Sequence, residues 1–138
     1  LTTILCKPEA NINGVPQAIM LDHVGNVCEC TADNIFIVKH GEVYTPPACL
    51  PILNGITRCT IMDLSNELGI PACEKCFSLH DMYTAGEVFL SGTGAELIPV
   101  IEVDGRKIAD GKPGPIFKTI LTRFREYANS NGDPIYSE

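Results

Sequence analysis

The sequence predicts one α+β domain, in which mixed strands and helices pack around a single core. Two observations support this prediction: strand-sized apolar segments recur between turn residues, and other segments repeat their apolar residues at helical spacing. The chain has 138 residues, enough to bury one core but few for a complete enzyme with a large cofactor. Because no repeat or linker interrupts the sequence, residues 1–138 are expected to fold as a single unit.

Eight segments are expected to form strands, most of them because they are apolar or β-branched and are bounded by turn residues. In chain order they are residues 17–21, 26–30, 34–39, 42–45, 72–77, 87–92, 97–103 and 106–108. His40 and Gly41 join the third and fourth of these segments in an expected hairpin. Asp104 and Gly105 mark a second hairpin, because this pair suits two residues with positive φ.

Four segments are expected to be helical. They are residues 2–13, 57–69, 78–83 and 115–128. The first resembles the end of a longer helix, in which Pro8 either kinks the interior or marks a fresh first turn. The second follows a proline-rich loop and ends at Gly69, and Ser78 can cap the third. Pro115 takes the first position of the fourth, whose apolar residues recur along one face.

Charge and composition exclude several classes of partner. The net charge is −7 and the ten Lys and Arg residues are scattered, so no basic stripe is present to bind nucleic acid. Binding of a small anionic ligand is not excluded by the charge, because backbone N–H groups bind phosphate whatever the net charge of the protein. No apolar run approaches the roughly 20 residues of a membrane helix. Seven cysteines, an odd number without a secretion signal, favour free thiols and a cytoplasmic location.

The cysteine spacing raises the alternative of a zinc or redox site, because Cys73 and Cys76 form CxxC and Cys28 and Cys30 form CxC. Alternate side chains of a strand point to opposite faces, so Cys73 and Cys76 are expected to diverge, and no metal site is assigned. Most of the cysteines are expected to be small buried hydrophobes. The three histidines are expected at the surface, and no nucleophile pattern accompanies them.

Four segments contain residue types suited to a phosphorylated pyridine cofactor. They are residues 27–47, 52–58, 85–100 and 103–115. In the first, an acidic residue precedes a small-residue turn and an Asn-apolar-Phe strand, and a second strand ends in Thr-Pro. In this order the segments resemble the class IV, fold-type IV aminotransferases that depend on pyridoxal 5′-phosphate, and DGK-x-GP favours the branched-chain amino acid group. The resemblance implies the larger C-terminal, cofactor-binding domain, a pseudo-barrel of strands surrounded by helices.

The resemblance also assigns the cofactor-binding residues. Glu29 is expected beside the pyridine nitrogen, where a carboxylate keeps that nitrogen protonated. Gly55, Ile56 and Thr57 are expected to hold the phosphate dianion at a helix N-terminus, and Thr93 to add a second hydroxyl. From local sequence alone, Glu29 is an exposed strand residue, Thr57 a plain N-cap and Thr93 part of an ordinary glycine turn.

The backbone amides of Gly94 and Ala95 are expected, by the same resemblance, to bind the substrate carboxylate. Arg58, beside the phosphate loop, is expected to be a structural ion-pair partner. Several positions depart from the family pattern and put substrate preference in doubt more than cofactor binding. They are Cys30, Ala32, Asn54, Gly86 and Gly94.

The implied activity is transfer of an amino group between a branched-chain L-amino acid and 2-oxoglutarate in a homo-oligomeric, dimer-based full-length protein. That chemistry needs a lysine that forms a Schiff base with the cofactor. In the family this lysine lies shortly before the position of Leu1, so no catalytic residue is assigned within the chain, and Lys7 is not given the role. The small N-terminal domain is also expected to be missing, which makes the chain an inactive fragment.

Three alternatives to this activity stay open at the level of sequence. A D-amino acid aminotransferase and an aminodeoxychorismate lyase share the fold and the phosphate loops. A non-catalytic binding module could keep the phosphate site on a degenerate scaffold, and Cys30 and Ala32 are the residues that favour it.

Overall fold

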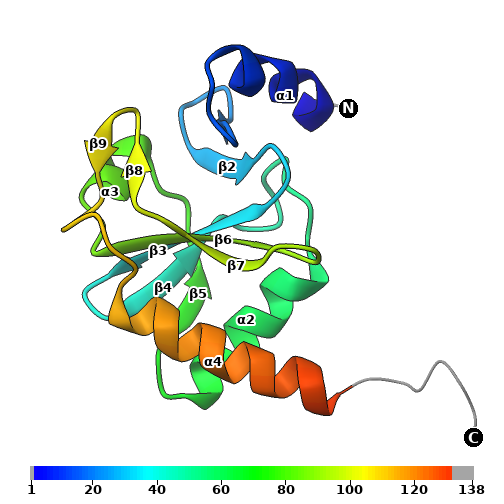
Figure 1. The fold of residues 1–138 in the computed structure, drawn as a ribbon, viewed down its shortest axis with the longest axis vertical. Coiled ribbons are helices and arrows are strands. Elements are labelled where there is room, and N and C mark those ends of the chain that lie inside the picture. Colours follow the sequence, from blue (N-terminus) through cyan, green and yellow to red (C-terminus); the bar gives the residue numbers. More distant parts are fainter. Residues whose placement is uncertain (1, 132–138) are drawn as a thin grey trace, which may run out of the picture.

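A five-stranded sheet forms the centre of the structure, a computed structural model that describes residues 2–131 (Figure 1). Its strand order is β5-β4-β3-β6-β7. The strands are β3 (Asn34–Lys39), β4 (Glu42–Thr45), β5 (Ala72–Glu74), β6 (Glu87–Gly92) and β7 (Glu96–Val100). The central pair, β3 and β6, is antiparallel, and only β4 and β5 run parallel. The mixed strands and helices confirm the predicted α+β class.

Helices α2 (Ile56–Glu67) and α4 (Pro115–Ser130) lie side by side and cover one face of this sheet (Figure 1). Apolar side chains fill the space between them. Phe36 of β3 stacks on Phe89 of β6 at a centroid distance of 4.9 Å, and Phe89 contacts Phe117 of α4 at 5.8 Å. Residues 36, 38 and 89 therefore point toward the helices, as the alternation of a strand requires.

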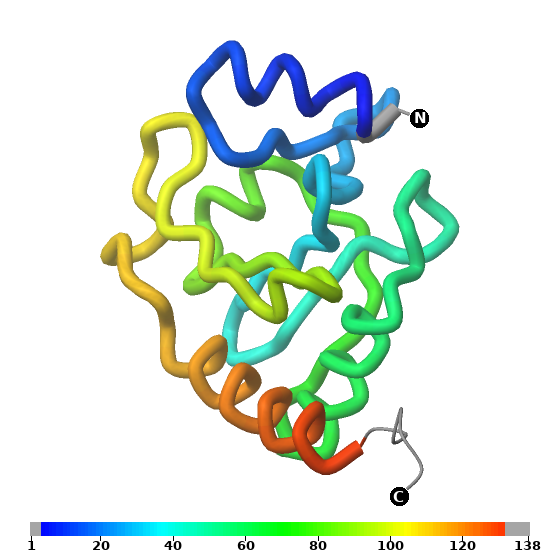
Figure 2. The backbone as a smooth tube through the Cα atoms, turned by 45° about the vertical axis from the view of Figure 1, so that its right-hand side comes forward, coloured from blue at the N-terminus to red at the C-terminus, as the bar shows by residue number. Residues whose placement is uncertain are grey.

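The opposite face is covered by short elements. They are β1 (Ile19–Leu21), β2 (Val27–Cys30), α3 (Leu79–Tyr83), β8 (Glu102–Val103) and β9 (Arg106–Lys107). Val27, Ile35 and Val88 belong to the apolar cluster beneath them. Helix α1 (Thr2–Ile12) lies beyond β1 and β2, at the end of the molecule opposite to α2 and α4 (Figure 2).

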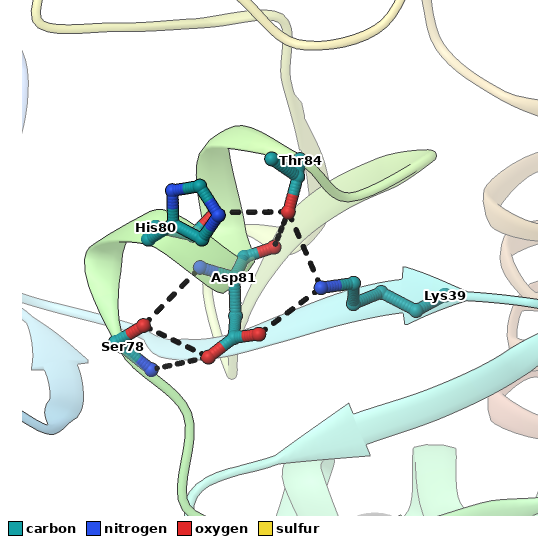
Figure 3. A network of polar contacts seen from close by, with 5 residues as sticks. All are labelled: Lys39, Ser78, His80, Asp81 and Thr84. Atoms are coloured by element: carbon teal, nitrogen blue, oxygen red, sulfur yellow. Dashed lines mark hydrogen bonds and ion pairs between the residues drawn. The ribbon is translucent and has the colours of Figure 1, made fainter.

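The short helix α3 has the predicted cap at Ser78 (Figure 3). The Ser78 hydroxyl oxygen accepts the Asp81 N–H at 3.3 Å, and the Asp81 carboxylate accepts the Ser78 N–H at 3.0 Å. Lys39, at the end of β3, donates to Asp81 at 3.0 Å. The Ser78 N–H and hydroxyl, followed by the Lys39 ammonium, lower the pKa of Asp81 to about 2. This network fastens α3 to the end of the central sheet.

Both predicted hairpins are confirmed. His40 and Gly41 have φ values of 54° and 81°, and Asp104 and Gly105 have values of 51° and 73°. Such pairs of positive φ are typical of two-residue turns that match strand twist. The predicted helices are also confirmed, with Pro8 inside α1.

The first predicted strand, residues 17–21, is observed only over Ile19–Leu21, and the segments 72–77 and 97–103 end or break before their expected last residue. The segment 72–77 leaves the sheet after Lys75, whose N–H donates to the Thr45 carbonyl at 2.9 Å. Phe77 then accepts the N–H of Val27, so the chain has turned to run beside β2. The segment 97–103 is interrupted at Ile101, where the chain passes from β7 to the separate β8–β9 hairpin.

The expectation that most cysteines are buried is wrong. Cys28 and Cys30 are buried in β2, Cys6 and Cys59 are half-buried, and Cys49, Cys73 and Cys76 are exposed. The exposed residues lie in the loop after β4, in the edge strand β5 and just after that strand.

No sheet closes on itself within residues 2–131, so the pseudo-barrel is not observed in this part of the chain. In the same part of the chain, no helix has the length and apolar character needed to cross a membrane.

Candidate functional site

A cavity of about 510 Å³ lies where three chain segments meet at the ends of β2, β3 and β6. It is lined by residues 29–34, 53, 55–57 and 91–94. The antiparallel register of the central strands pairs Asn34 with Ser91, which brings the turn before β3 next to the turn after β6. The start of α2 closes the third side.

Glycine is required where the two turns touch. A Cβ added to Gly92 would lie 2.0 Å from Oδ1 of Asp33, a buried carboxylate that also accepts a hydrogen bond from Gln17. Gln17 also accepts the N–H of Ala32 at 3.2 Å. The turn after β2 is therefore held by Gln17 on one side and packed against Gly92 on the other.

Glu29 is buried, with 8% of its surface exposed, and its side chain faces the cavity. Its Oε2 accepts the N–H of Leu53 at 2.9 Å, which joins β2 to the loop before α2. The other carboxylate oxygen makes no hydrogen bond to residues 2–131. The alternative of an exposed strand residue is therefore wrong, and one oxygen of Glu29 is free to accept a proton donor from a ligand.

Helix α2 begins at Ile56 with Gly55 as its N-cap, and no side chain caps it. The first intrahelical bond runs from the Cys59 N–H to the Gly55 carbonyl, so the amides of Ile56, Thr57 and Arg58 have no partner within the helix. The alternative in which Thr57 is the N-cap is wrong. An uncapped N-terminus at a cavity favours an anion, through its N–H groups and its dipole.

Arg58 is a structural residue, as predicted. Its side chain is 2% exposed and pairs with Glu74 of β5 at 2.5 Å. The guanidinium also donates to the Pro46 carbonyl at 2.8 Å and to the Asn54 side chain at 2.9 Å. The Arg58 hydrogen bond lowers the pKa of Glu74. Arg58 thus holds the proline-rich loop against α2 and faces away from the cavity.

The turn after β6 presents Thr93 and Gly94 to the cavity, and both are exposed. Ala95 is half-buried and does not line the cavity. The structure therefore brings six of the seven predicted site residues together around one space. It leaves Ala95 outside, and the individual roles of all seven stay predictions.

Two residues that line the cavity, Asp33 and Ser91, and a third residue behind its wall, Gln17, were not singled out from the sequence. Asp33 and Gln17 hold the turn described above. The hydroxyl of Ser91 is buried and has no hydrogen-bond partner in the described part of the chain. Its position at the end of a predicted strand, two residues before the turn that holds Thr93, was the available signal.

Cys30 lines the cavity but is not suited to act as a nucleophile. Burial, followed by the nearby charges of Asp33 and Glu29, raises the pKa of its thiol to about 12. The thiol is therefore neutral at ordinary pH.

Among the described residues, no cluster of three or more His, Cys, Asp or Glu side chains could hold a metal ion.

A second cavity, of about 540 Å³, lies at the start of α4. Here Glu87 of β6 is buried and accepts the N–H groups of Ile116 at 3.0 Å and Phe117 at 2.7 Å. This carboxylate already satisfies the helix N-terminus, so the second cavity does not favour an anion in the way the first does.

Comparison with known proteins gives consistent results. The family model described as amino-transferase class IV matches residues 1–103. A putative branched-chain-amino-acid aminotransferase from Methanocaldococcus jannaschii is 45% identical over 138 residues, which is 100% of this chain and 48% of that protein. The chain thus spans about half the length of this curated relative.

Two solved structures show the same fold. The branched-chain aminotransferase from Thermoproteus uzoniensis, crystallised with norvaline, has a TM-score of 0.87 and 41% identity, over 93% of this chain and 42% of that one. The branched-chain amino acid aminotransferase from Thermobaculum terrenum in its PLP form has a TM-score of 0.88 and 35% identity, over 93% and 42%.

Proposed function

This chain belongs to the class IV aminotransferases, and we propose that it binds pyridoxal 5′-phosphate in a full-length branched-chain amino acid aminotransferase. That protein transfers the amino group between a branched-chain L-amino acid and 2-oxoglutarate. One observation carries the proposal: segments far apart in the sequence meet at one cavity, which combines a buried carboxylate with an uncapped helix N-terminus.

The start of α2 fits the phosphate of the cofactor. The amides of Ile56 and Thr57 are free to donate, and no acidic side chain in the first turn of the helix repels an anion. The hydroxyls of Thr57 and Thr93 lie at the same cavity and supply two further donors. Gly55 lets the backbone at the start of α2 lie close to Asn34, because a Cβ on Gly55 would lie 2.5 Å from Asn34 Oδ1.

Glu29 fits the pyridine nitrogen. Its bond to the Leu53 N–H fixes one oxygen, and the second oxygen would accept the N–H of the ring nitrogen and so favour the protonated ring. When bound, pyridoxal phosphate supplies a ring that accepts the electrons released as the substrate loses its Cα proton. The Gly94 amide and, beyond the cavity edge, the Ala95 amide orient the substrate carboxylate.

The proton-transferring lysine and the small N-terminal domain are supplied, in this proposal, by residues beyond the 138. None of the six lysines of the chain, all of which the structure describes, lines the cavity. The curated relative described above is about twice as long as the chain. The chain alone is accordingly inactive, and the full-length protein completes the pseudo-barrel and forms a dimer. The seven free thiols support a reducing, cytoplasmic location.

The test is an amino-transfer assay of the full-length protein with 2-oxoglutarate, comparing L-leucine with D-alanine. Turnover of L-leucine supports the proposal, whereas turnover of D-alanine alone contradicts the substrate assignment.

Glu29→Gln should lower kcat by at least about tenfold, because a neutral amide no longer keeps the ring nitrogen protonated. Glu102→Gln is the matched control, since Glu102 is an exposed strand residue outside the cavity. Equal loss in both variants would refute the role of Glu29.

A further inference from the structure

We propose that the Ser91 hydroxyl is a further phosphate-binding group of this site, which donates a hydrogen bond to the anion held at the start of α2. Nothing in the sequence pattern that marks Glu29, Thr57 and Thr93 assigns a role to Ser91. The inference rests on the proposed function, because it concerns the same cofactor.

The orientation of Ser91 follows from the strand. Phe89, two residues earlier on β6, points to the face covered by α2 and α4, where it contacts Phe117. Side chains two residues apart on a strand share a face, so Ser91 points to the same face of the sheet as Phe89, the face that carries α2. Ser91 also pairs with Asn34, whose side chain lies against Gly55 at the N-cap of α2. Ser91 is therefore placed beneath the first turn of α2.

The burial of Ser91 is unusual for a hydroxyl without a partner. Only 1% of its surface is exposed, yet its Oγ makes no hydrogen bond to any described residue. The contrast is Ser65 in α2, which is 0% exposed and donates to the Ile61 carbonyl at 2.7 Å. Buried polar groups in folded proteins are normally paired, so an unpaired one at a cavity wall indicates a missing ligand.

The neighbouring groups favour an anion as that ligand. The first turn of α2 offers amide donors and the positive end of the helix dipole, and Thr57 and Thr93 offer hydroxyls. Of the nearby carboxylates, Asp33 accepts a hydrogen bond from Gln17, and Glu29 accepts one from Leu53 with one of its two oxygens. A serine hydroxyl that donates to a phosphate oxygen satisfies both the serine and the anion.

The experiment compares pyridoxal 5′-phosphate with pyridoxal, which lacks the phosphate, in equilibrium binding to the full-length protein. Ser91→Ala should weaken binding of pyridoxal 5′-phosphate by about tenfold, the usual effect of one hydrogen bond to a charged group, and leave pyridoxal unchanged. The thermal stability of the cofactor-free variant should equal that of the wild type, because the hydroxyl has no partner to lose.

Ser65→Ala is the matched control. It removes a buried serine whose bond is satisfied, so it should lower stability without changing the preference for the phosphorylated ligand.

The outcomes separate this inference from the proposed function. If Thr57→Ala selectively weakens binding of pyridoxal 5′-phosphate and Ser91→Ala does not, the role of Ser91 is refuted. The proposed cofactor site is then still supported. If the wild type does not prefer pyridoxal 5′-phosphate over pyridoxal, the cofactor site itself is refuted. A loss of cofactor-free stability in Ser91→Ala would also overturn the inference, because it would indicate a structural role.

Discussion

Gly55→Ala is expected to destabilise the protein through a single contact. Gly55 has φ −67° and ψ 142°, a conformation open to any residue, so the cost comes from space alone. The new Cβ would lie 2.5 Å from Oδ1 of Asn34, whereas ordinary contact begins at 3.4 Å. Asn34 must therefore retreat by about 0.9 Å. That retreat breaks the 2.7 Å bond from its side-chain amide to the Leu53 carbonyl.

The expected magnitude combines three effects. The lost hydrogen bond costs about 1 kcal/mol, and the crowding adds about 1–2 kcal/mol. Alanine also restricts the unfolded chain, which offsets about 0.5 kcal/mol. We expect the free energy of unfolding of the cofactor-free, full-length protein to fall by about 2 kcal/mol, measured by urea denaturation.

Gly94→Ala is the matched control, because a Cβ there meets nothing within 4 Å and the backbone φ is not positive. Its effect should lie within about 0.5 kcal/mol. In an Asn34→Ala background the cost of Gly55→Ala should disappear, since the opposing oxygen is gone. A full 2 kcal/mol loss in that background would refute the steric reasoning.

Two further predictions concern buried or paired carboxylates. Asp81→Asn should lower stability by about 1 kcal/mol at pH 6, a value reduced for screening because the side chain is 42% exposed. The pKa of Asp81 in the folded protein is about 2, below its ordinary value of 3.8. The stability difference between the wild type and Asp81→Asn should therefore disappear as the pH falls from 4 to 2. A difference that persists at pH 2 would contradict this prediction. Glu87→Gln should cost about 2 kcal/mol in urea denaturation, because a neutral amide oxygen can replace only one of two charge-assisted bonds to α4. Unchanged stability would show that this carboxylate does not hold the helix.

Features fixed by neighbouring residues could be predicted from the sequence. The hairpin at Asp104 and Gly105 needs only two residues with positive φ, and the capping box of α3 depends on Ser78 and Asp81 three residues later. The end of α2 at Gly69 follows from the same kind of local chemistry, since Gly69 has a φ of 74°. The hairpin, the Ser78 cap and the stop at Gly69 were each predicted at the correct position, whereas the reciprocal bond to the Asp81 carboxylate was not predicted.

Features that depend on tertiary contacts were missed. The exposure of Cys73 follows from the place of β5 at a sheet edge, and the side chain alone does not indicate it. That the Ser91 hydroxyl is buried without a hydrogen-bond partner can be recognised only once the register of β3 and β6 is known. One tertiary feature was not missed: the grouping of Glu29 with Thr57 and Thr93 was predicted, but only through the family resemblance, because no local rule links residues so far apart.

The most direct test of the central claim is a crystal structure of the full-length protein with pyridoxal 5′-phosphate. The proposed function predicts the phosphate within hydrogen-bonding distance of the Ile56 and Thr57 amides and of the Thr93 hydroxyl. It also predicts the pyridine nitrogen against Glu29. A cofactor bound elsewhere, or one whose ring nitrogen lies away from Glu29, would contradict it.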